Sequence, residues 1–378
     1  MKNKILIVAG ARPNFMKVAP LIRELRDYKK QFDVILVHTG QHYDFVMSDI
    51  FFQNLNIPRP DIYLKVGSHS HAVQTARIMS AFEKVALDEK PDLVIVVGDV
   101  NSTLACSLVA AKMNIRVAHV EAGLRSFDRS MPEEINRIVT DSLSNYLFVS
   151  EESGLKNLKK EGVHPGRIFF VGNVMIDTLL WNMKKIDSSA VLESSSLKCA
   201  APPLKPKSYC VLTLHRPSNV DSNKALSEIF EIITSVSDCI KIIYPIHPRT
   251  RKMINSLGFG DKFAGIANLT MIDPLGYIDF IKLVKNSMFV LTDSGGIQEE
   301  STMLGIPCLT MRENTERPVT LSKGTNYLVG RNKNKIIKCV RLFLNGKAKK
   351  KDIPQLWDGK AAQRIVNIIA KSFDEAKG

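Results

Sequence analysis

Residues 92–123, DLVIVVGDVNSTLACSLVAAKMNIRVAHVEAG, decide the fold. The apolar run at 92–99 predicts a buried strand, residues 104–113 predict a helix, and VAHVEAG at 117–123 predicts the next strand. A strand, a helix and a strand in this order form a parallel pair joined by a crossover helix. The segment therefore indicates a doubly wound α/β sheet with the first of these strands near its centre.

The same alternation extends in both directions along the chain. In the first half it predicts strands at 4–10, 33–40, 146–150 and 167–173, and helices at about 14–28, 73–87, 133–143 and 151–161. Residues 184–207 are rich in Ser, Lys and Pro and predict an irregular linker. Beyond it we expect strands at 209–215, 241–247, 288–294 and 307–312, and helices at 224–236, 278–285, 296–304 and 360–376.

The chain has 378 residues, which is too long for one ordinary core, so two domains are expected. We predict two Rossmann-like α/β domains that face each other across a cleft. The first covers residues 1–180 and is completed by a C-terminal helix at about 358–378. The second covers residues 181–357.

Composition excludes several classes of protein. The chain is 45% hydrophobic and 24% charged, which is typical of globular proteins. No stretch is long and apolar enough for a transmembrane span, and the run at 5–8 is too short for a signal peptide, so a cytoplasmic location is expected. The six cysteines are scattered without metal-ligand spacing, which predicts reduced thiols and no zinc site.

The chain is basic, with a formal net charge of +14 and a pI of about 9.4. Such a charge suits RNA, a membrane surface or a small anion. The sequence contains no nucleic-acid-binding motif and no aromatic residues set between basic ones. A phosphate-bearing metabolite therefore explains the charge better, and a basic RNA-binding module remains the non-enzyme alternative.

Residues 119–137, HVEAGLRSFDRSMPEEINR, concentrate charge at the expected ligand edge of the first sheet. Glu121 follows a short apolar run and is expected at the carboxyl end of a buried strand. Glu133 follows Pro132 and is expected in the first turn of a helix. Asp99 ends a neighbouring strand, although it could also serve as an ordinary helix cap. Together these three carboxylates could supply acid and base functions around a bound sugar.

Candidate anion contacts occur at other strand ends. The turn at 10–17 has one glycine where a dinucleotide fingerprint has three, so NAD is disfavoured, but Arg12 and Lys17 lie beside a helix start. His215 and His247 end successive strands, and each is followed closely by arginine. The TDSGG turn at 292–296 is suited to phosphate, and Glu300 lies on the helix after it. Arg317 adds a further possible contact. A structural turn or a structural histidine is the alternative at each of these places.

Taken together, these motifs resemble the non-hydrolysing UDP-N-acetylglucosamine 2-epimerases. The matching pieces follow the family's order over most of the chain and are GARPNFMK, TGQHYD, GDVNST, HVEAGLRS, MPEEINR, GNVMID, LHRPSNVD, PIHP, DSGGIQEE and MRENTERP. The resemblance implies a GT-B fold, a homodimer and no metal or nicotinamide cofactor. It also implies reversible C2 epimerisation of UDP-N-acetylglucosamine to UDP-N-acetylmannosamine, by elimination and re-addition of UDP through 2-acetamidoglucal, which would supply surface polysaccharide synthesis.

The resemblance also implies a role for each matching residue. The first domain would carry the acid and base groups, and the second would bind UDP. The acid/base carboxylates would be Asp99, Glu121 and Glu133, with His215 catalytic or diphosphate-binding. Substrate contacts would come from Arg12, Lys17, Arg137, Ser294, Gly295, Gly296, Glu300 and Arg317, and Tyr277 in PLGYIDF would line the uracil.

Two positions depart from the family pattern. Residues 216–221, RPSNVD, stand where many members carry a longer Arg-Glu motif, and Tyr43-Asp44 follow Gln41-His42 where many have an Arg-Glu pair. The second difference affects the region of the allosteric substrate site in bacterial members. Allosteric activation by UDP-N-acetylglucosamine is therefore left open for this chain. A modified UDP-hexosamine also remains open as substrate, as do a hydrolysing 2-epimerase and a UDP-sugar glycosyltransferase on the same fold.

Overall fold

The computed structural model describes residues 2–41, 58–194, 197, 204–350 and 352–375. The chain divides into two compact units, which are considered separately below. Unit 1 comprises Met1–Trp181 and Gln355–Gly378, and unit 2 comprises Asn182–Pro354.

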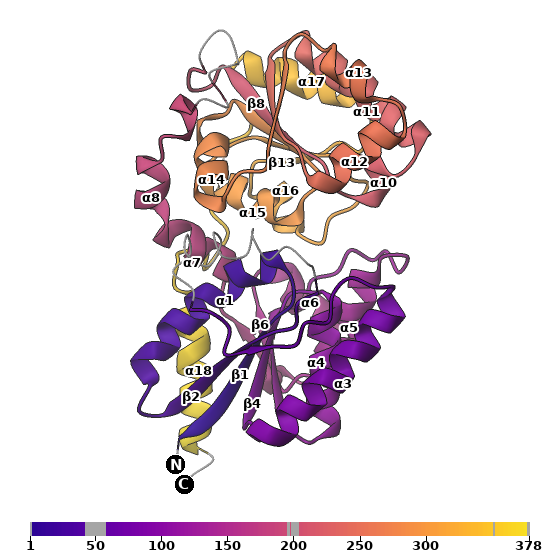
Figure 1. The fold of residues 1–378 in the computed structure, drawn as a ribbon. Coiled ribbons are helices and arrows are strands. Elements are labelled where there is room, and N and C mark those ends of the chain that lie inside the picture. Colours follow the sequence, from indigo (N-terminus) through magenta and orange to yellow (C-terminus); the bar gives the residue numbers. More distant parts are fainter. Residues whose placement is uncertain (1, 42–57, 195–196, 198–203, 351, 376–378) are drawn as a thin grey trace. The chain divides into compact units, whose positions relative to one another are not determined.

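Unit 1 is a parallel sheet with helices on both faces (Figure 1). Its strand order is β3-β2-β1-β4-β5-β6-β7. The strands are β1 (Asn3–Ala9), β2 (Phe32–His38), β3 (Ile62–Tyr63), β4 (Leu93–Val97), β5 (Arg116–Ala122), β6 (Tyr146–Val149) and β7 (Ile168–Phe170). The helices are α1 (Arg12–Leu25), α3 (His71–Glu89), α4 (Asn101–Lys112), α5 (Pro132–Leu143), α6 (Glu152–Lys160), α7 (Val174–Trp181) and α18 (Ala361–Glu375).

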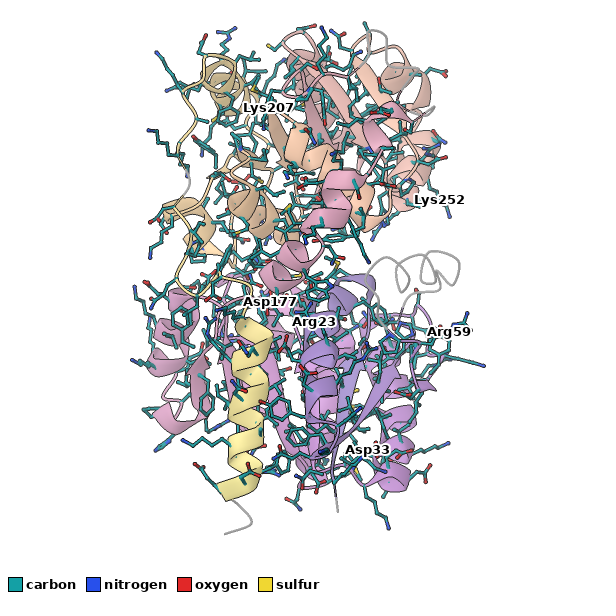
Figure 2. The ribbon with its side chains drawn as sticks, turned by 90° about the vertical axis from the view of Figure 1, so that its left-hand side faces the viewer. Arg23, Asp33, Arg59, Asp177, Lys207 and Lys252 are labelled. Carbon is teal, nitrogen blue, oxygen red and sulfur yellow. The ribbon has the colours of Figure 1, made fainter. Side chains whose placement is uncertain are left out.

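The centre of this sheet is apolar, as the sequence predicts. Every residue of β4 is buried, because β1 and β5 pair with it on either side and helices cover both faces. The C-terminal helix α18 packs against α1 and α7 of the same unit. Asp177 holds its start, since its carboxylate accepts the main-chain N–H groups of Ala361 at 3.2 Å and Ala362 at 2.7 Å (Figure 2).

Unit 2 repeats the same topology. Its strand order is β10-β9-β8-β11-β12-β13, and all pairs are parallel. The strands are β8 (Tyr209–Thr213), β9 (Lys241–Pro245), β10 (Leu269–Ile272), β11 (Phe289–Thr292), β12 (Cys308–Thr310) and β13 (Asn326–Leu328). The helices are α8 (Met183–Ser188), α10 (Pro217–Val220), α11 (Asn223–Ser237), α12 (Pro248–Ser256), α13 (Gly260–Ala264), α14 (Tyr277–Asn286), α15 (Gly295–Leu304), α16 (Pro318–Ser322) and α17 (Lys333–Leu344). Short 3₁₀ turns lie at Arg26–Tyr28 and Pro165–Arg167 in unit 1 and at Val191–Glu193 in unit 2.

Both units confirm the predicted α/β class with doubly wound parallel sheets. One local prediction is wrong: residues 184–207 are not irregular throughout, because α8 begins at Met183 and a 3₁₀ turn covers Val191–Glu193. Part of that predicted linker, residues 195–196 and 198–203, lies outside the described residues.

The described helices include none that is long and apolar enough to cross a lipid bilayer. In both sheets the strand order reverses direction beside the first strand, between β1 and β4 and between β8 and β11. Ligands of doubly wound folds bind at such switch points, at the carboxyl ends of the strands. These two edges are therefore the places to search for a site.

Candidate active site

The switch point of unit 1 is built around Asn14, in the first turn of α1. Its carboxamide oxygen accepts the main-chain N–H groups of Gly10 at 3.1 Å and Ala11 at 2.8 Å. Its amide nitrogen donates to the carbonyl of Val97 at 3.1 Å. One buried side chain thus joins the end of β1 to the end of β4 and fixes the edge on which the predicted residues lie.

Lys17 and Glu121 form a buried ion pair at this edge. The side chains are 9% and 6% exposed, and the Lys17 ammonium donates directly to Glu121 Oε2. A Cβ added at Gly98 would lie 2.9 Å from Lys17 Nζ, so glycine is needed there to let the ammonium pass. Burying a carboxylate is costly unless it is paired, and Lys17 supplies the partner for Glu121.

Asp99 lies beside Arg137, with Arg137 Nη1 2.5 Å from Asp99 Oδ2. Asp99 keeps 28% of its side chain exposed, whereas Arg137 is buried. The same guanidinium also donates to Glu134 Oε2 at 2.5 Å. Arg137 is thereby held rigidly between two carboxylates, and only one of them, Asp99, is open to solvent.

Glu134 is a site residue that the sequence argument missed. Its carboxylate accepts the main-chain N–H groups of Ser126 and Phe127, both at 2.9 Å. Burial by itself raises the pKa of Glu134, but the Ser126 N–H and the Arg137 guanidinium outweigh burial and lower it. Glu134 therefore stays ionised and orders the loop. The signal in the sequence was its spacing of three residues from Arg137 on one helix.

Glu133 and Arg12 complete the predictions for unit 1. Glu133 lies in the first turn of α5, as predicted, and its side chain is partly exposed. In the part of the chain that the structure describes, no hydrogen bond or ion pair holds its carboxylate. Arg12 is the first residue of α1, but its side chain lies outside the described part.

The switch point of unit 2 is organised by a second residue that sequence reasoning missed, Asp293. This fully buried carboxylate accepts the main-chain N–H groups of His215 and Arg216 and the amide of Asn219. Its Oδ1 lies 2.9 Å from His215 Nδ1. Burial by itself raises the pKa of Asp293, yet the contact with His215 outweighs it and the pKa is lowered.

His215 is thus oriented by a buried carboxylate while 44% of its side chain stays exposed. The ring of His247 lies 6.1 Å from it, centroid to centroid, so the two predicted histidines share one edge. His247 also caps α12, because its Nδ1 accepts the N–H of Arg249 at 3.3 Å. The ring of His247 is exposed.

The glycine turn after β11 lies against Arg317. Ser294 is the N-cap of α15, and Gly295 and Gly296 form its first turn. A Cβ at Gly295 would lie 2.8 Å from Glu316 Oε1 and 3.3 Å from Arg317 Nη1, so a larger residue there would displace these side-chain ends. The N–H groups at the helix start are suited to an anion, and the buried Arg317 lies beside them.

Arg317 does not stand alone as a cation. Its Nε lies 2.7 Å from Glu299 Oε1, and its Nη1 lies 2.7 Å from Glu316 Oε1. Glu316 in turn pairs with Arg312 at 2.8 Å. The four buried charges form a balanced set that fixes the guanidinium beside the turn.

Glu300 and Tyr277 meet in the interior of unit 2. Burial raises the pKa of Glu300 to about 8, the nearby Tyr277 hydroxyl opposes that rise, and the neighbouring Glu299 adds to it. The raised pKa favours the protonated carboxyl group at neutral pH. A carboxyl group in that state can accept or donate a hydrogen bond, and either suits a sugar hydroxyl.

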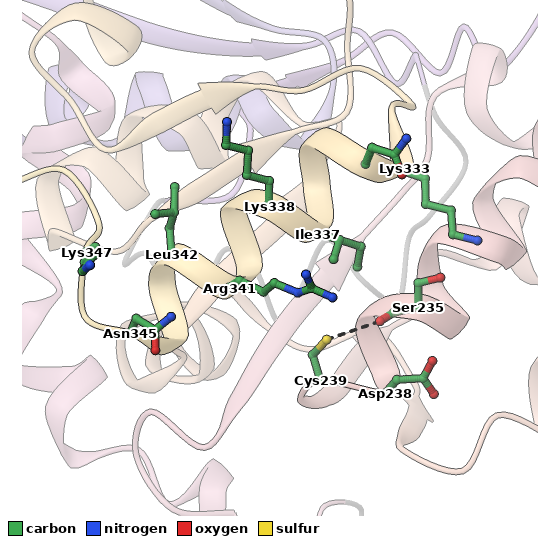
Figure 3. Close-up of a pocket in the computed structure, with 11 residues that line it drawn as sticks. Ser235, Asp238, Cys239, Lys333, Ile337, Lys338, Arg341, Leu342, Asn345 and Lys347 are labelled. Carbon is green, nitrogen blue, oxygen red and sulfur yellow. Dashed lines mark hydrogen bonds between the residues drawn. The ribbon is translucent and has the colours of Figure 1, made fainter.

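A separate groove in unit 2 contains none of the predicted residues. It lies between the end of α11 and α17, and Lys333, Lys338, Arg341 and Lys347 give it a basic lining (Figure 3).

The described residues include no group of three or more His, Cys, Asp or Glu side chains placed to hold a metal ion. The chemistry is therefore sought at the two switch points.

Two doubly wound α/β units in one chain are the architecture of the GT-B-like fold class. Comparison with known proteins narrows this class. The chain belongs to the UDP-N-acetylglucosamine 2-epimerase family, whose model matches residues 23–370, and it is therefore an enzyme of the isomerase class.

Relatives match over nearly the whole chain. A UDP-N-acetylglucosamine 2-epimerase of Methanocaldococcus jannaschii is 44% identical over 97% of this chain and 98% of its own length. A UDP-2,3-diacetamido-2,3-dideoxy-D-glucuronate 2-epimerase of Pseudomonas aeruginosa is 39% identical over 97% of this chain and 99% of its own. The crystal structure of the Methanocaldococcus jannaschii enzyme in complex with UDP-GlcNAc and UDP matches with a TM-score of 0.89, covering 97% of this chain and 99% of that one.

Proposed function

We propose that this enzyme interconverts UDP-N-acetylglucosamine and UDP-N-acetylmannosamine without net hydrolysis. The observation that carries the proposal is the grouping of Lys17, Glu121, Asp99 and Arg137 at one switch point of unit 1. This edge offers two carboxylates of different exposure, each beside a fixed cation. Carboxylates placed in this way can take a proton from a carbon atom and return it.

The substrate explains why the proton cannot simply be removed. The C2 hydrogen lies beside carbons that bear only oxygen or nitrogen substituents and is barely acidic. Loss of UDP from C1 makes that carbon electron-deficient and the C2 hydrogen far more acidic. The proposed reaction is therefore an elimination: the C1–O bond breaks, a base takes the C2 proton, and 2-acetamidoglucal and UDP form.

The second half of the proposed reaction reverses these steps on the other face of C2. An acid donates a proton to C2 from the opposite side, and a β-phosphate oxygen of UDP attacks C1. Atoms and charge balance, because the elimination releases one proton and one UDP, and the addition consumes one proton and one UDP. Acid and base groups are needed on two sides of the ring, and unit 1 offers Asp99, Glu121 and Glu133 for them.

The residues of unit 2 support a role in holding UDP. The turn at Ser294, Gly295 and Gly296, with Arg317 against it, is suited to a diphosphate whose charge grows as the C1–O bond breaks. Preorganised contacts of this kind contribute roughly 3 kcal/mol each to stabilising such a charge. His215, held by Asp293, is a further donor, and Glu300 and Tyr277 are the proposed contacts to ribose and uracil.

Incubation with UDP-N-acetylglucosamine in deuterated water tests this proposal. Proton NMR and mass spectrometry should show UDP-N-acetylmannosamine with deuterium at C2, and deuterium entering the recovered substrate. Free sugar and stoichiometric UDP would instead establish a hydrolysing epimerase. Substrate that stays unchanged until an acceptor sugar is added would establish a glycosyltransferase.

A modified UDP-hexosamine is a second candidate substrate. The relative from Pseudomonas aeruginosa is named for a diacetamido uronate, at 39% identity. Comparing kcat/KM for that compound and for UDP-N-acetylglucosamine decides between them. A higher value for the uronate would replace the first candidate and leave the C2 chemistry unchanged.

The proposed cellular setting follows from this reaction. We expect a cytoplasmic homodimer that supplies activated N-acetylmannosamine for surface polysaccharide synthesis. Sedimentation of the purified enzyme tests the dimer, and loss of that sugar from surface polysaccharide in a deletion strain tests the role.

A further inference from the structure

The main chain at Glu121 is in a conformation that a residue other than glycine rarely adopts. Its φ is +77°, and the pairing of β5 with β6 shifts register between Val120 and Ala122, so Glu121 is the bulged residue. A left-handed conformation of this kind persists only where the surrounding structure enforces it. Something in unit 1 must therefore hold the bulge.

Asp141 of α5 grips the chain on both sides of that bulge. Its Oδ1 lies 2.6 Å from Nδ1 of His119, two residues before Glu121. Its Oδ2 accepts the main-chain N–H of Gly123, two residues after Glu121, at 3.0 Å. One carboxylate thus fixes the ends of the five-residue segment whose middle residue is Glu121.

His119 extends this hold to the neighbouring strand. Its Nε2 lies 2.8 Å from the carbonyl oxygen of Gly98, after β4, and the N–H of Gly98 donates to the carbonyl of Val120 at 3.0 Å. Both partners of the ring, a carboxylate and a carbonyl, can only accept hydrogen bonds. The fully buried ring of His119 is thus held from both sides, by Asp141 and by Gly98.

A buried arginine reaches the same carboxylate. Arg125 lies 2.7 Å from Asp141 and also bonds to Glu161 through two nitrogens, at 2.8 and 2.7 Å. Arg125 thus links Asp141 to Glu161. Burial by itself raises the pKa of Asp141, but His119 and Arg125 lower it, so the carboxylate is ionised. Glu121 remains available to Lys17.

We infer that Asp141 and His119 are positioning residues that lock Glu121 in its left-handed conformation and aim its carboxylate at the reacting carbon. This inference rests on the proposed role of Glu121 and adds two residues to it. Neither residue need touch the substrate. If the lock is broken, the bulge relaxes to an ordinary strand, which would turn the Glu121 side chain toward the other face of the sheet.

The kinetic test is Asp141→Asn. A carboxamide has only one accepting oxygen, so its NH₂ group would oppose either His119 or the N–H of Gly123. We expect kcat to fall by at least about 100-fold, because even a displacement of about 1 Å costs a reacting group that much, while KM and the affinity for UDP stay as in the wild type. The matched control is Asp177→Asn, the same change at another buried carboxylate of unit 1 that accepts main-chain N–H groups, and it should keep its kcat.

Two results would overturn the inference. One is a wild-type kcat in Asp141→Asn. The other is an equal fall in kcat in the two variants once each is compared at the same fraction folded, because that would show a stability effect only. Glu121→Gln separates this from failure of the proposed function: if Glu121→Gln itself epimerises normally, the proposed role of Glu121 is wrong whatever Asp141→Asn does.

Two structural measurements need no activity. In a crystal structure of Asp141→Asn, Glu121 should lose its positive φ and its contact with Lys17, and retention of both would contradict the lock. If that variant does not fold, nitrogen NMR of the wild-type enzyme labelled at histidine gives the answer. The ring N–H signal of His119 should be protected from exchange with solvent, as hydrogen bonds to Asp141 and Gly98 require, and a ring N–H that exchanges freely would overturn the inference.

Discussion

The ion pair between Lys17 and Glu121 allows a quantitative test of how unit 1 is built. Lys17→Met keeps the aliphatic stem but leaves the buried Glu121 carboxylate without its ammonium partner. Removing one member of a buried pair costs about 3–5 kcal/mol, because a desolvated charge remains. Glu121→Gln should cost a similar amount, because it leaves the buried Lys17 ammonium without its carboxylate partner. The double variant should lose less than the sum of the two by about 3 kcal/mol.

The assay is urea unfolding followed by tryptophan fluorescence. Both tryptophans of the chain, Trp181 and Trp357, belong to unit 1, so their emission reports on that unit alone. The matched control is Lys4→Met. Lys4 pairs with Glu89 at 2.8 Å in the same unit, but 29% of each side chain is exposed. That pair should contribute less than about 1 kcal/mol.

A specific outcome would refute this reasoning. If Lys17→Met costs no more than Lys4→Met, and if the effects of Lys17→Met and Glu121→Gln simply add, the pair behaves like one in water. In that case the environment of Glu121 is not the enclosed one described above, and the argument for a positioned base would lose its electrostatic basis.

Three further predictions concern single residues. Because burial raises the pKa of Glu300 from 4.5 to about 8, the folded state holds a proton that the unfolded chain has lost between these values, so stability falls as pH rises through that window. Glu300→Gln should remove this fall and stabilise unit 2 by up to about 5 kcal/mol above pH 8, measured by hydrogen exchange in α15; an unchanged pH profile would contradict it. Arg317→Lys should keep the fold and weaken UDP binding about tenfold or more by calorimetry, because an ammonium lacks the planar fork of N–H groups that can reach Glu299, Glu316 and a phosphate from fixed positions, whereas Arg312→Lys should bind UDP with nearly the wild-type affinity. Glu133→Gln should retain UDP affinity and lower kcat by about 100-fold or more, and near wild-type turnover would remove Glu133 from the acid/base set.

The sequence was informative where burial is uniform. Long apolar runs such as 92–99 predicted the central strands, because a parallel strand covered on both faces cannot tolerate polar residues. The short strands β3, β10 and β13 were missed, since two to four partly buried residues at or near a sheet edge leave no such run. Helix α17 was also missed, although Ile336, Cys339, Val340 and Phe343 carry a helical spacing that could have revealed it.

The site was predictable at the level of strand ends, and less so at the level of what holds each group. Lys17, Glu121, Asp99 and Arg137 come together as the doubly wound topology requires. Asp141 and Asp293 were not singled out, because a lone aspartate on a helix or in a turn resembles a solvated or capping residue. Their importance comes from contacts with residues far along the chain, such as His215 and Asp293, which are 78 positions apart in sequence.

The positive φ of Glu121 could not be read from the sequence at all. The residues around it are typical of an ordinary strand. The hydrogen bonds on either side of the bulge are made by Asp141, which lies on helix α5. Such a local departure from the expected pattern is where a functional constraint is expected to appear.

The central claim is that the bond between C1 and the diphosphate breaks and re-forms during epimerisation. Substrate carrying a heavy oxygen isotope in the bridging position tests it most directly, because free UDP can rotate its β-phosphate before it adds back. Phosphorus NMR of the recovered substrate should show the label spread to the non-bridging positions as C2 inverts. If C2 inverts while the label stays entirely in the bridge, the bond has not broken, and the elimination described here is contradicted.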